Sequence, residues 1–471
     1  MIPGGLAAGT RDVHAAYDGS LIAQVETGGA AAVETALATA FAKYRDRDSW
    51  LTSAQRIAIL ERTAGIIQSR AEELAVGAAR EGGKPLIDSR VEIARGIDGV
   101  RNSIEVMRTE GGKEIPMGIN AASLGRVAFT RKEPIGVVVA VSAFNHPFNL
   151  IIHQVMPAVA TGCPIIVKPA AATPLSCMRI VGILREAGLP EAWCQPIVTA
   201  SSDDATRLAT DPRVSFFAFI GSPGVGWMLR SKLAPGTRCA LEHGGAAPVI
   251  VAEDANLDEA LPLLLKGGFY HAGQVCVSVQ RIFAHSSIAR ELANRLADGA
   301  RKLRIGDSTS PETEVGPLIS TKEVDRVAEW VTEAVDGGAE CLSGGSKLSD
   351  TCYECTVLFN PPQQARVSQN EIFGPVVCVY SYDDLDDAIG LANSLPFAFQ
   401  SAVFTQNIDT ALRVYRRIRA SAVMVNDHSA FRVDWAPFAG LDVSGHGVGG
   451  IPYTMEEMQI EKMIVIKSKE L

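Results

Sequence analysis

Ile135-Gly-Val-Val-Val-Ala-Val141 is the stretch of sequence that decides the fold. Its unbroken run of β-branched residues is typical of a strand that is buried on both faces of a sheet. A helix-like pattern of apolar residues follows at 148–160, the next strand pattern spans 164–168, and another helix pattern spans 174–187. Alternating strands and helices of this length predict a parallel, doubly wound α/β sheet.

The alternation continues in two series that are separated near residue 245. Further strands are predicted at 195–198, 215–220, 238–241, 248–251, 281–284, 376–380, 400–404 and 422–425. The first 112 residues have mostly helical spacing and are interpreted as scaffold around the first series. A chain of 471 residues is longer than one core usually serves, so we expect at least two domains.

Composition excludes several classes of function. A formal charge of −9 offers no basic field for nucleic acid or an anionic membrane, and we expect neither partner. The chain has no secretory signal pattern and no apolar run near the roughly 20 residues of a membrane span. Nine cysteines without regular spacing argue against a disulfide framework and favour a cytoplasmic location. The one close pair, Cys352-Tyr-Glu-Cys355, is interpreted as a loop feature, and no metal is expected.

Polar residues follow the predicted strands where a doubly wound sheet binds its ligands. Asn145, Lys168, Gly221-Ser222 and Glu242 each stand at or just after the end of a strand. Cys276 follows Gly273-Gln274 at the end of an apolar, helix-like run. A thiolate in such a turn is a good nucleophile, whereas a cysteine considered alone is more often a small buried hydrophobe.

Six short motifs place these residues in a known context. They are Phe144-Asn-His-Pro147, Val167-Lys-Pro-Ala170, Phe219-Ile-Gly-Ser-Pro-Gly-Val-Gly226, Leu241-Glu-His-Gly-Gly245, Gly273-Gln-Val-Cys276 and Glu371-Ile-Phe-Gly-Pro375. In this order and spacing the chain resembles the aldehyde dehydrogenase superfamily, from roughly residue 30 to the C-terminus. Pro437-Phe-Ala-Gly440, with Ser444-Gly445, resembles a further family segment.

The resemblance implies a role for four catalytic residues. Cys276 would add to the aldehyde carbonyl, and the Asn145 amide with the Cys276 backbone N–H would stabilise the oxyanion. Glu242 would be the general base that activates water to hydrolyse the thioester. Lys168 would bind the adenine-ribose hydroxyls and support the site. Taken singly, Asn145 is a turn or cap residue, Glu242 a solvated loop residue and Lys168 a surface lysine.

The resemblance also implies a dinucleotide cofactor, NAD or NADP. The residues expected to contact it are Val141, Ala143, Phe144, Lys168, Ala171, Gly221, Ser222, Gly244, Glu371 and Phe373. Gly221-Ser222 precedes a helix start, which is either a simple N-cap or an anion site for the pyrophosphate. Ala171 stands where NAD-preferring relatives carry a glutamate, whose charge would repel a 2′-phosphate. Because alanine removes that repulsion, we predict that NADP is tolerated.

Polar residues occupy positions that face the aldehyde in the family. They are His146, Asn149 and His153, with Leu150 between them, and His428, Phe431 and Arg432 on a second wall. Arg432 would bind a carboxylate or phosphate bidentately, or it would form an ion pair with Asp434 or at the surface. We therefore expect a small polar or anionic aldehyde as substrate.

The resemblance divides the chain into three parts. Residues 1–112 and 136–244 would form the dinucleotide-binding domain, 245–443 the catalytic domain, and 113–135 with 452–471 an oligomerisation arm. An exposed strand edge in such an arm needs a partner, so we expect a homodimer or homotetramer. The predicted activity is NAD(P)-dependent oxidation of an aldehyde to the acid. The alternatives are an acylating, coenzyme A-dependent enzyme and a non-catalytic relative.

Overall fold

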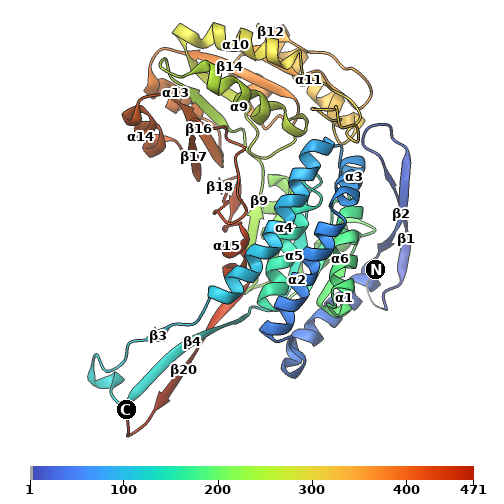
Figure 1. Ribbon diagram of the computed structural model, residues 1–471, viewed down its shortest axis with the longest axis vertical. Helices are drawn as coiled ribbons and strands as arrows, with labels where there is room; N and C mark the ends of the chain where they lie inside the picture. The colour runs from blue at the N-terminus through green and yellow to red at the C-terminus, as the bar shows by residue number, and fades with distance from the viewer. Residues whose placement is uncertain (1–3) are drawn as a thin grey trace.

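A computed structural model describes residues 4–471 and confirms the α/β fold (Figure 1). Two large sheets form the body, and a narrow three-stranded sheet extends away from it. The chain passes from the first large sheet to the second between β9 (Arg238–Glu242) and β10 (Pro248–Val251). The predicted domain boundary near residue 245 falls in this segment. Among residues 4–471, no helix combines the length and apolar character that crossing a bilayer requires.

The first large sheet has the strand order β19-β9-β8-β5-β6-β7. Its strands are β5 (Val137–Val141), β6 (Ile165–Lys168), β7 (Cys194–Pro196), β8 (Val214–Ile220), β9 and β19 (Gly445–His446). All neighbours are parallel except β19, which pairs antiparallel with β9. The strand predicted first, β5, lies between β6 and β8.

Alternate residues of β5 face two separate cores. Val138 and Ala140 belong to the core beneath α2 (Ser53–Ser69), α3 (Ala71–Gly82), α4 (Leu86–Thr109), α5 (Asn149–Thr161) and α6 (Leu175–Glu186). Val137 and Val139 belong to the core beneath α1 (Ala30–Arg45), α7 (Ser202–Thr210) and α8 (Pro223–Arg230). Because helices cover both faces, each of these four side chains is fully buried, which explains the unbroken apolar run.

The second large sheet has the order β12-β13-β14-β11-β10-β16-β17. Its strands are β10, β11 (Arg281–His285), β12 (Glu340–Ser343), β13 (Thr356–Phe359), β14 (Val376–Tyr382), β16 (Gln400–Phe404) and β17 (Ala422–Val425). Its helices are α9 (Leu257–Phe269), α10 (Ser286–Ala300), α11 (Thr321–Asp336), α12 (Arg366–Gln369), α13 (Leu385–Ala392) and α14 (Ile408–Arg417). The predicted strands at 248–251, 400–404 and 422–425 match β10, β16 and β17 to the residue.

The narrow sheet consists of β3 (Glu114–Ile115), β4 (Arg126–Pro134) and β20 (Gln459–Lys467). It projects from the body with the C-terminus near its tip (Figure 1). Residues 452–458, predicted to belong to this arm, instead lie mostly in α15 (Ile451–Glu457), whose Ile451 and Met455 join the core beneath α4 and α5. The helix packs there because its apolar residues are spaced for burial on one side.

The helical expectation for the N-terminal region was wrong over residues 7–28. These form an antiparallel hairpin of β1 (Ala7–His14) and β2 (Leu21–Gly28). Most β1 side chains are exposed, so the strand carries no apolar alternation that sequence analysis could detect. Residues 30–109 are mostly helical as predicted, in α1, α2, α3 and α4.

A fully buried ion pair connects α4 with the start of α5. Lys84 Nζ lies 2.6 Å from Glu92 Oε2, and both side chains are at most 1% exposed. The other carboxylate oxygen, Oε1, accepts hydrogen bonds from the backbone N–H groups of Phe148 and Asn149 at 2.9 and 2.8 Å. These N–H groups have no partner within their own helix, so Glu92 caps α5 from a distant part of the chain.

Glu92→Ala is expected to lower the melting temperature by several degrees. The change leaves the Lys84 ammonium buried without its partner, which typically costs about 3–5 kcal/mol. Glu72→Ala is the matched control, because it breaks an exposed ion pair with Arg90 between α3 and α4. Thermal unfolding followed by circular dichroism checks this, and equal melting temperatures for the two variants would contradict it.

Candidate active site

A cavity of about 580 Å³ lies at the carboxyl ends of β5, β8 and β9. This is the edge where a doubly wound sheet binds ligands. Among the residues singled out from sequence, the cavity is lined by Val141, Ala143, Phe144, Asn145, His146, Asn149, Leu150, His153, Gly221, Ser222, Glu242, Gly244, Cys276, Glu371, Phe373 and Arg432. The fold therefore brings the predicted nucleophile, amide and general base to one space.

Cys276 follows a strained turn, η4 (Tyr270–Gly273). His271 and Ala272 adopt left-handed backbone angles, with φ of 50° and 54°. Gly273 shares this conformation, and a Cβ there would lie 2.1 Å from the Gly374 carbonyl oxygen, so only glycine fits. This irregular turn, rather than a regular helix, places the Cys276 thiol at the cavity.

The Cys276 thiol is protonated in this environment. Burial, together with the carboxylates of Glu371 and Glu242, raises its pKa to about 12, while the Arg432 guanidinium opposes the shift. Since the thiolate is the reactive form, addition to a carbonyl requires a group that takes up the thiol proton.

The Asn145 amide is fastened to the nucleophile turn. Its Nδ2 donates a hydrogen bond to the Gln274 carbonyl oxygen at 2.9 Å, and the side chain is buried. One N–H of the amide is thereby used, and the second is left for another acceptor. The side chain is held in place by the same loop that carries Cys276.

Two partly buried carboxylates lie close to glycines. A Cβ on Gly449 would lie 2.1 Å from Glu242 Oε1, and a Cβ on Gly244 would lie 2.0 Å from both Glu371 oxygens. Burial raises the pKa of Glu242, with Arg432 opposing the shift. Burial also raises the pKa of Glu371 to about 8, although its Oε1 accepts a hydrogen bond from the Gly245 N–H at 3.0 Å.

The other end of the cavity suits a dinucleotide. Ser222 is the N-cap residue of α8, which begins at Pro223, and Gly221, Ser222 and Val225 line the cavity at the start of this helix. The Phe144 and Phe373 rings stack edge to face, with centroids 5.9 Å apart. Glu371 also lines the cavity, and its Oε2 can accept a further hydrogen bond. The two rings suit a nicotinamide, and the carboxylate suits the hydroxyls of its ribose.

Lys168 and Ala171 lie outside this cavity lining. Lys168 ends β6, and its Nζ donates to the Pro169 carbonyl oxygen at 3.4 Å. Ala171 is exposed in the loop that follows. Their expected contacts with the adenine end of a cofactor stay predictions.

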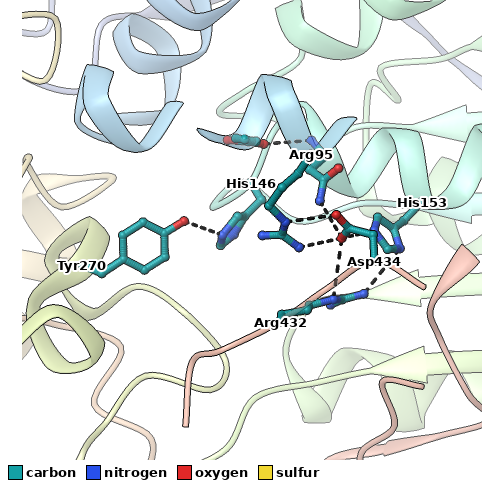
Figure 2. Close-up of polar contacts among 8 residues, drawn as sticks. Arg95, His146, His153, Tyr270, Arg432 and Asp434 are labelled. Carbon is teal, nitrogen blue, oxygen red and sulfur yellow. Dashed lines mark hydrogen bonds and ion pairs between the residues drawn. The ribbon is translucent and has the colours of Figure 1, made fainter. Parts of the chain in front are cut away.

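At the opposite end, Asp434 is the centre of a polar cluster (Figure 2). Its two carboxylate oxygens accept hydrogen bonds from Arg95 Nε and Nη2 at 3.0 and 2.6 Å, a bidentate pair. His153 Nε2 and Asn149 Nδ2 reach Oδ1 at 2.7 and 3.3 Å. These partners hold the pKa of the Asp434 carboxyl well below its ordinary value against the effect of burial.

Arg432 lies beside this cluster but is weakly bound to it. Its Nε is 3.9 Å from Asp434 Oδ1, and its Nη2 is 3.4 Å from His153 Nδ1. Its guanidinium carbon lies 3.5 Å from the centroid of the Phe438 ring, a cation–π contact. Nε is buried and has no hydrogen-bond partner among residues 4–471. The geometry therefore does not favour the alternative, a close ion pair between Arg432 and Asp434.

The tautomer of His153 follows from its two neighbours. Burial and Arg432 lower its pKa to about 4, so the ring is neutral near pH 7. Because Asp434 is ionised, Nε2 must carry the proton and donate it. Nδ1 is then an acceptor directed at Arg432 Nη2, which orients the guanidinium.

Two expected substrate residues lie elsewhere. Neither His428 nor Phe431 lines the cavity, and the Phe431 side chain is 47% exposed. Their roles stay predictions. The cavity instead includes residues that sequence analysis did not select, namely Arg95, Tyr270, Arg326, Trp330 and Phe438. Tyr270 hydrogen-bonds through its hydroxyl to His146 Nε2 at 3.0 Å.

Comparisons with known proteins agree with this geometry. A sequence model of the "Aldehyde dehydrogenase family" matches residues 6–464. The chain is 37% identical to the 3-sulfolactaldehyde dehydrogenase of Priestia aryabhattai over 88% of this chain and 86% of that protein.

Two solved structures are also similar. Aldehyde dehydrogenase 21 from Physcomitrella patens, in complex with the reaction product succinate, has a TM-score of 0.93 and 33% identity, covering 97% of this chain and 95% of that one. Glyceraldehyde-3-phosphate dehydrogenase GapN from Methanocaldococcus jannaschii, complexed with NADP, has a TM-score of 0.92 and 32% identity, covering 97% and 99%. With the fold and the site already described, these matches establish that the chain belongs to the aldehyde dehydrogenase family and is an NAD(P)-dependent oxidoreductase acting on an aldehyde.

Proposed function

We propose that this enzyme oxidises a small aldehyde that carries an anionic group to the corresponding carboxylic acid. The observation that carries the proposal is Arg432, whose buried guanidinium shares a cavity with Cys276 and keeps an unpaired Nε. A buried cation without a close partner is costly, and an anion on the substrate would supply the missing partner.

The neighbouring carboxylate does not compete strongly for this cation. Asp434 is engaged by Arg95 through two hydrogen bonds, whereas its nearest approach to Arg432 is 3.9 Å. The planar guanidinium of Arg432 suits carboxylate, sulfonate and phosphate groups, because each offers two oxygens in its plane. Cys276 at the same cavity would receive the aldehyde end of such a molecule.

The names of three relatives point in the same direction, while others are named for betaine aldehyde, which is a cation, and for neutral lactaldehyde. One acts on 3-sulfolactaldehyde, another was crystallised with its product succinate, and a third is named for glyceraldehyde 3-phosphate. All three compounds carry an anionic group on a short carbon chain. This supports the same substrate class for the present enzyme.

In the proposed reaction, the Cys276 thiol gives up its proton to water, the sulfur forms a bond to the aldehyde carbon, and the carbonyl oxygen becomes an oxyanion. Asn145, with its remaining amide N–H, and the Cys276 backbone N–H would stabilise that charge. A bound NAD or NADP supplies the acceptor for the hydride that leaves the same carbon. The Cys276 thioester then remains, and Glu242 would take a proton from the water that cleaves its C–S bond. Cys276 leaves as thiol and the acid is released.

Glu242 favours hydrolysis over the two alternatives. Desolvation raises the pKa of its partly buried carboxylate, which makes it a better base than an exposed glutamate. Transfer of the thioester to coenzyme A would not require this base. A non-catalytic relative would not be expected to retain Cys276, Asn145 and Glu242 in one cavity.

The expected partner is a second copy of the chain. In β20 the side chains of Met463, Ile464, Val465 and Ile466 are each 43–54% exposed on a strand at the edge of the narrow sheet. Consecutive exposed apolar residues on an edge strand favour coverage by another strand, and we infer a homodimer or homotetramer. The nine cysteines are all free, which supports the cytoplasmic location expected from sequence.

Arg432→Ala is expected to raise the KM for an anionic aldehyde roughly 10- to 100-fold. This is the loss of affinity that follows when one charge-assisted hydrogen bond is removed. The KM for a neutral aldehyde of equal length should change little. Arg432→Lys is the matched control, because it keeps the charge without the planar fork. Steady-state kinetics checks this, and equal changes for both substrates would remove the role of Arg432 in anion binding.

Glu242→Gln is expected to slow steady-state turnover roughly 10²- to 10⁴-fold by removing the general base. Hydride transfer precedes thioester hydrolysis, so a rapid burst of about one reduced cofactor per active site should remain. Stopped-flow absorbance measures both phases. Loss of the burst together with turnover would place the glutamate in an earlier step.

Ala171→Glu is expected to shift the ratio of kcat/KM values from NADP toward NAD, because the new carboxylate repels a 2′-phosphate. Ala172→Glu, at the next exposed position of the loop, is the matched control for added charge. The ratio is measured with one saturating aldehyde. An identical ratio in all three proteins would show that Ala171 does not contact the 2′ position.

A further inference from the structure

The polar end of the cavity contains two cations and one anion in contact. We name Arg95, Arg432, Asp434, His153 and Asn149 the anion cradle (Figure 2). Both guanidinium groups line the cavity, and Asp434 lies behind them with a side chain 3% exposed. Every member except Asn149 is a titratable or charged group, so the cradle has a definite charge.

That charge is a single positive unit. Arg95 and Arg432 stay protonated at any physiological pH. Asp434 is ionised, since its partners lower its pKa, and His153 is neutral because its pKa lies at about 4. The bidentate bonds pair Asp434 with Arg95, so within the cradle the positive charge of Arg432 has no close partner, and the other carboxylate that acts on Arg432 is Glu242.

We propose that Asp434 sets the charge of the substrate, so that the cradle selects aldehydes bearing one negative charge over those bearing two. The proposal rests on the proposed function, because it assumes that the substrate anion binds at Arg432. Asp434 is a positioning and specificity-determining residue in this scheme. It acts through Arg95, His153 and Arg432 and does not itself contact the substrate.

The physical reason is charge balance in a buried site. A sulfonate or carboxylate would bring the cradle to neutrality, and a phosphate monoester dianion would leave one negative charge in excess next to Asp434. Unpaired charge in a poorly solvated site is costly, and repulsion from a nearby like charge discriminates against the wrong ligand without direct contact. Glu242 shares the cavity, and its charge adds to the same penalty for a dianion.

Two probes of one carbon skeleton test the inference. 3-Sulfolactaldehyde carries a sulfonate monoanion, and glyceraldehyde 3-phosphate is a dianion at pH 8 because the second phosphate pKa is about 6. Four proteins are compared: the wild type, Asp434→Asn, Arg95→Met and the double variant. Asparagine keeps an oxygen that accepts from Arg95 and His153, and it removes the negative charge. The quantity measured is the ratio of kcat/KM for the monoanion to that for the dianion.

The wild-type ratio is expected to favour the monoanion. Asp434→Asn raises the cradle charge to two, and it should shift the ratio toward the dianion by roughly tenfold or more. Arg95→Met leaves no net charge, so efficiency should fall with both probes relative to neutral glyceraldehyde. The double variant again carries one charge and should return the ratio toward the wild-type value. A purely structural role of Asp434 would not produce this return.

The outcomes distinguish a failure of the charge-selection role of Asp434 from a failure of the proposed function. An unchanged ratio in Asp434→Asn, or a double variant that does not regain the wild-type ratio, overturns the charge-selection role of Asp434. A wild type that does not prefer either anionic probe over glyceraldehyde overturns the proposed function itself. Because both probes are measured on one preparation, the ratio does not depend on the fraction of enzyme that is folded.

Discussion

The position of β5 between two parallel neighbours is the constraint on which the active site depends. Val137, Val138, Val139 and Ala140 are fully buried between two helical layers, so a one-residue shift of register would move each side chain out of the core in which it packs and into the other core. Its carboxyl end is thereby fixed beside those of β8 and β9. The residues that follow these three strands meet in one cavity because the strands are parallel and in register.

Two buried glutamates, Glu92 and Glu81, have the same role in the half of the molecule that contains β5. Glu92 holds Lys84 and caps α5, and Glu81 accepts hydrogen bonds from the Leu175 and Ser176 N–H groups at the start of α6. Each carboxylate replaces water at a buried helix N-terminus, where the helix dipole favours negative charge. Because α5 carries Asn149 and His153, the Glu92 cap also fixes the helix that presents the anion cradle.

The sequence located most strands of the two large sheets, because each follows from a local apolar pattern, but it did not predict β12, β13 or β19. Apolar runs located β5 and β10 to within two residues. The β1–β2 hairpin was missed because its exposed side chains lack periodicity. Arg95 was missed for a different reason. It is one charged residue in a long helix, and only the fold shows that it meets Asp434, 339 positions away.

Arg432 connects substrate recognition with the chemistry. Burial raises the pKa values of both Cys276 and Glu242, and the Arg432 guanidinium is the one cation that opposes the shift in each. The same residue therefore presents the expected anion site and stabilises the charged forms of the nucleophile and the base. A substrate anion bound to Arg432 would weaken that effect and leave Glu242 more basic, at the stage when water must be deprotonated. The cation–π contact with Phe438 keeps the guanidinium in this position without adding a competing negative charge.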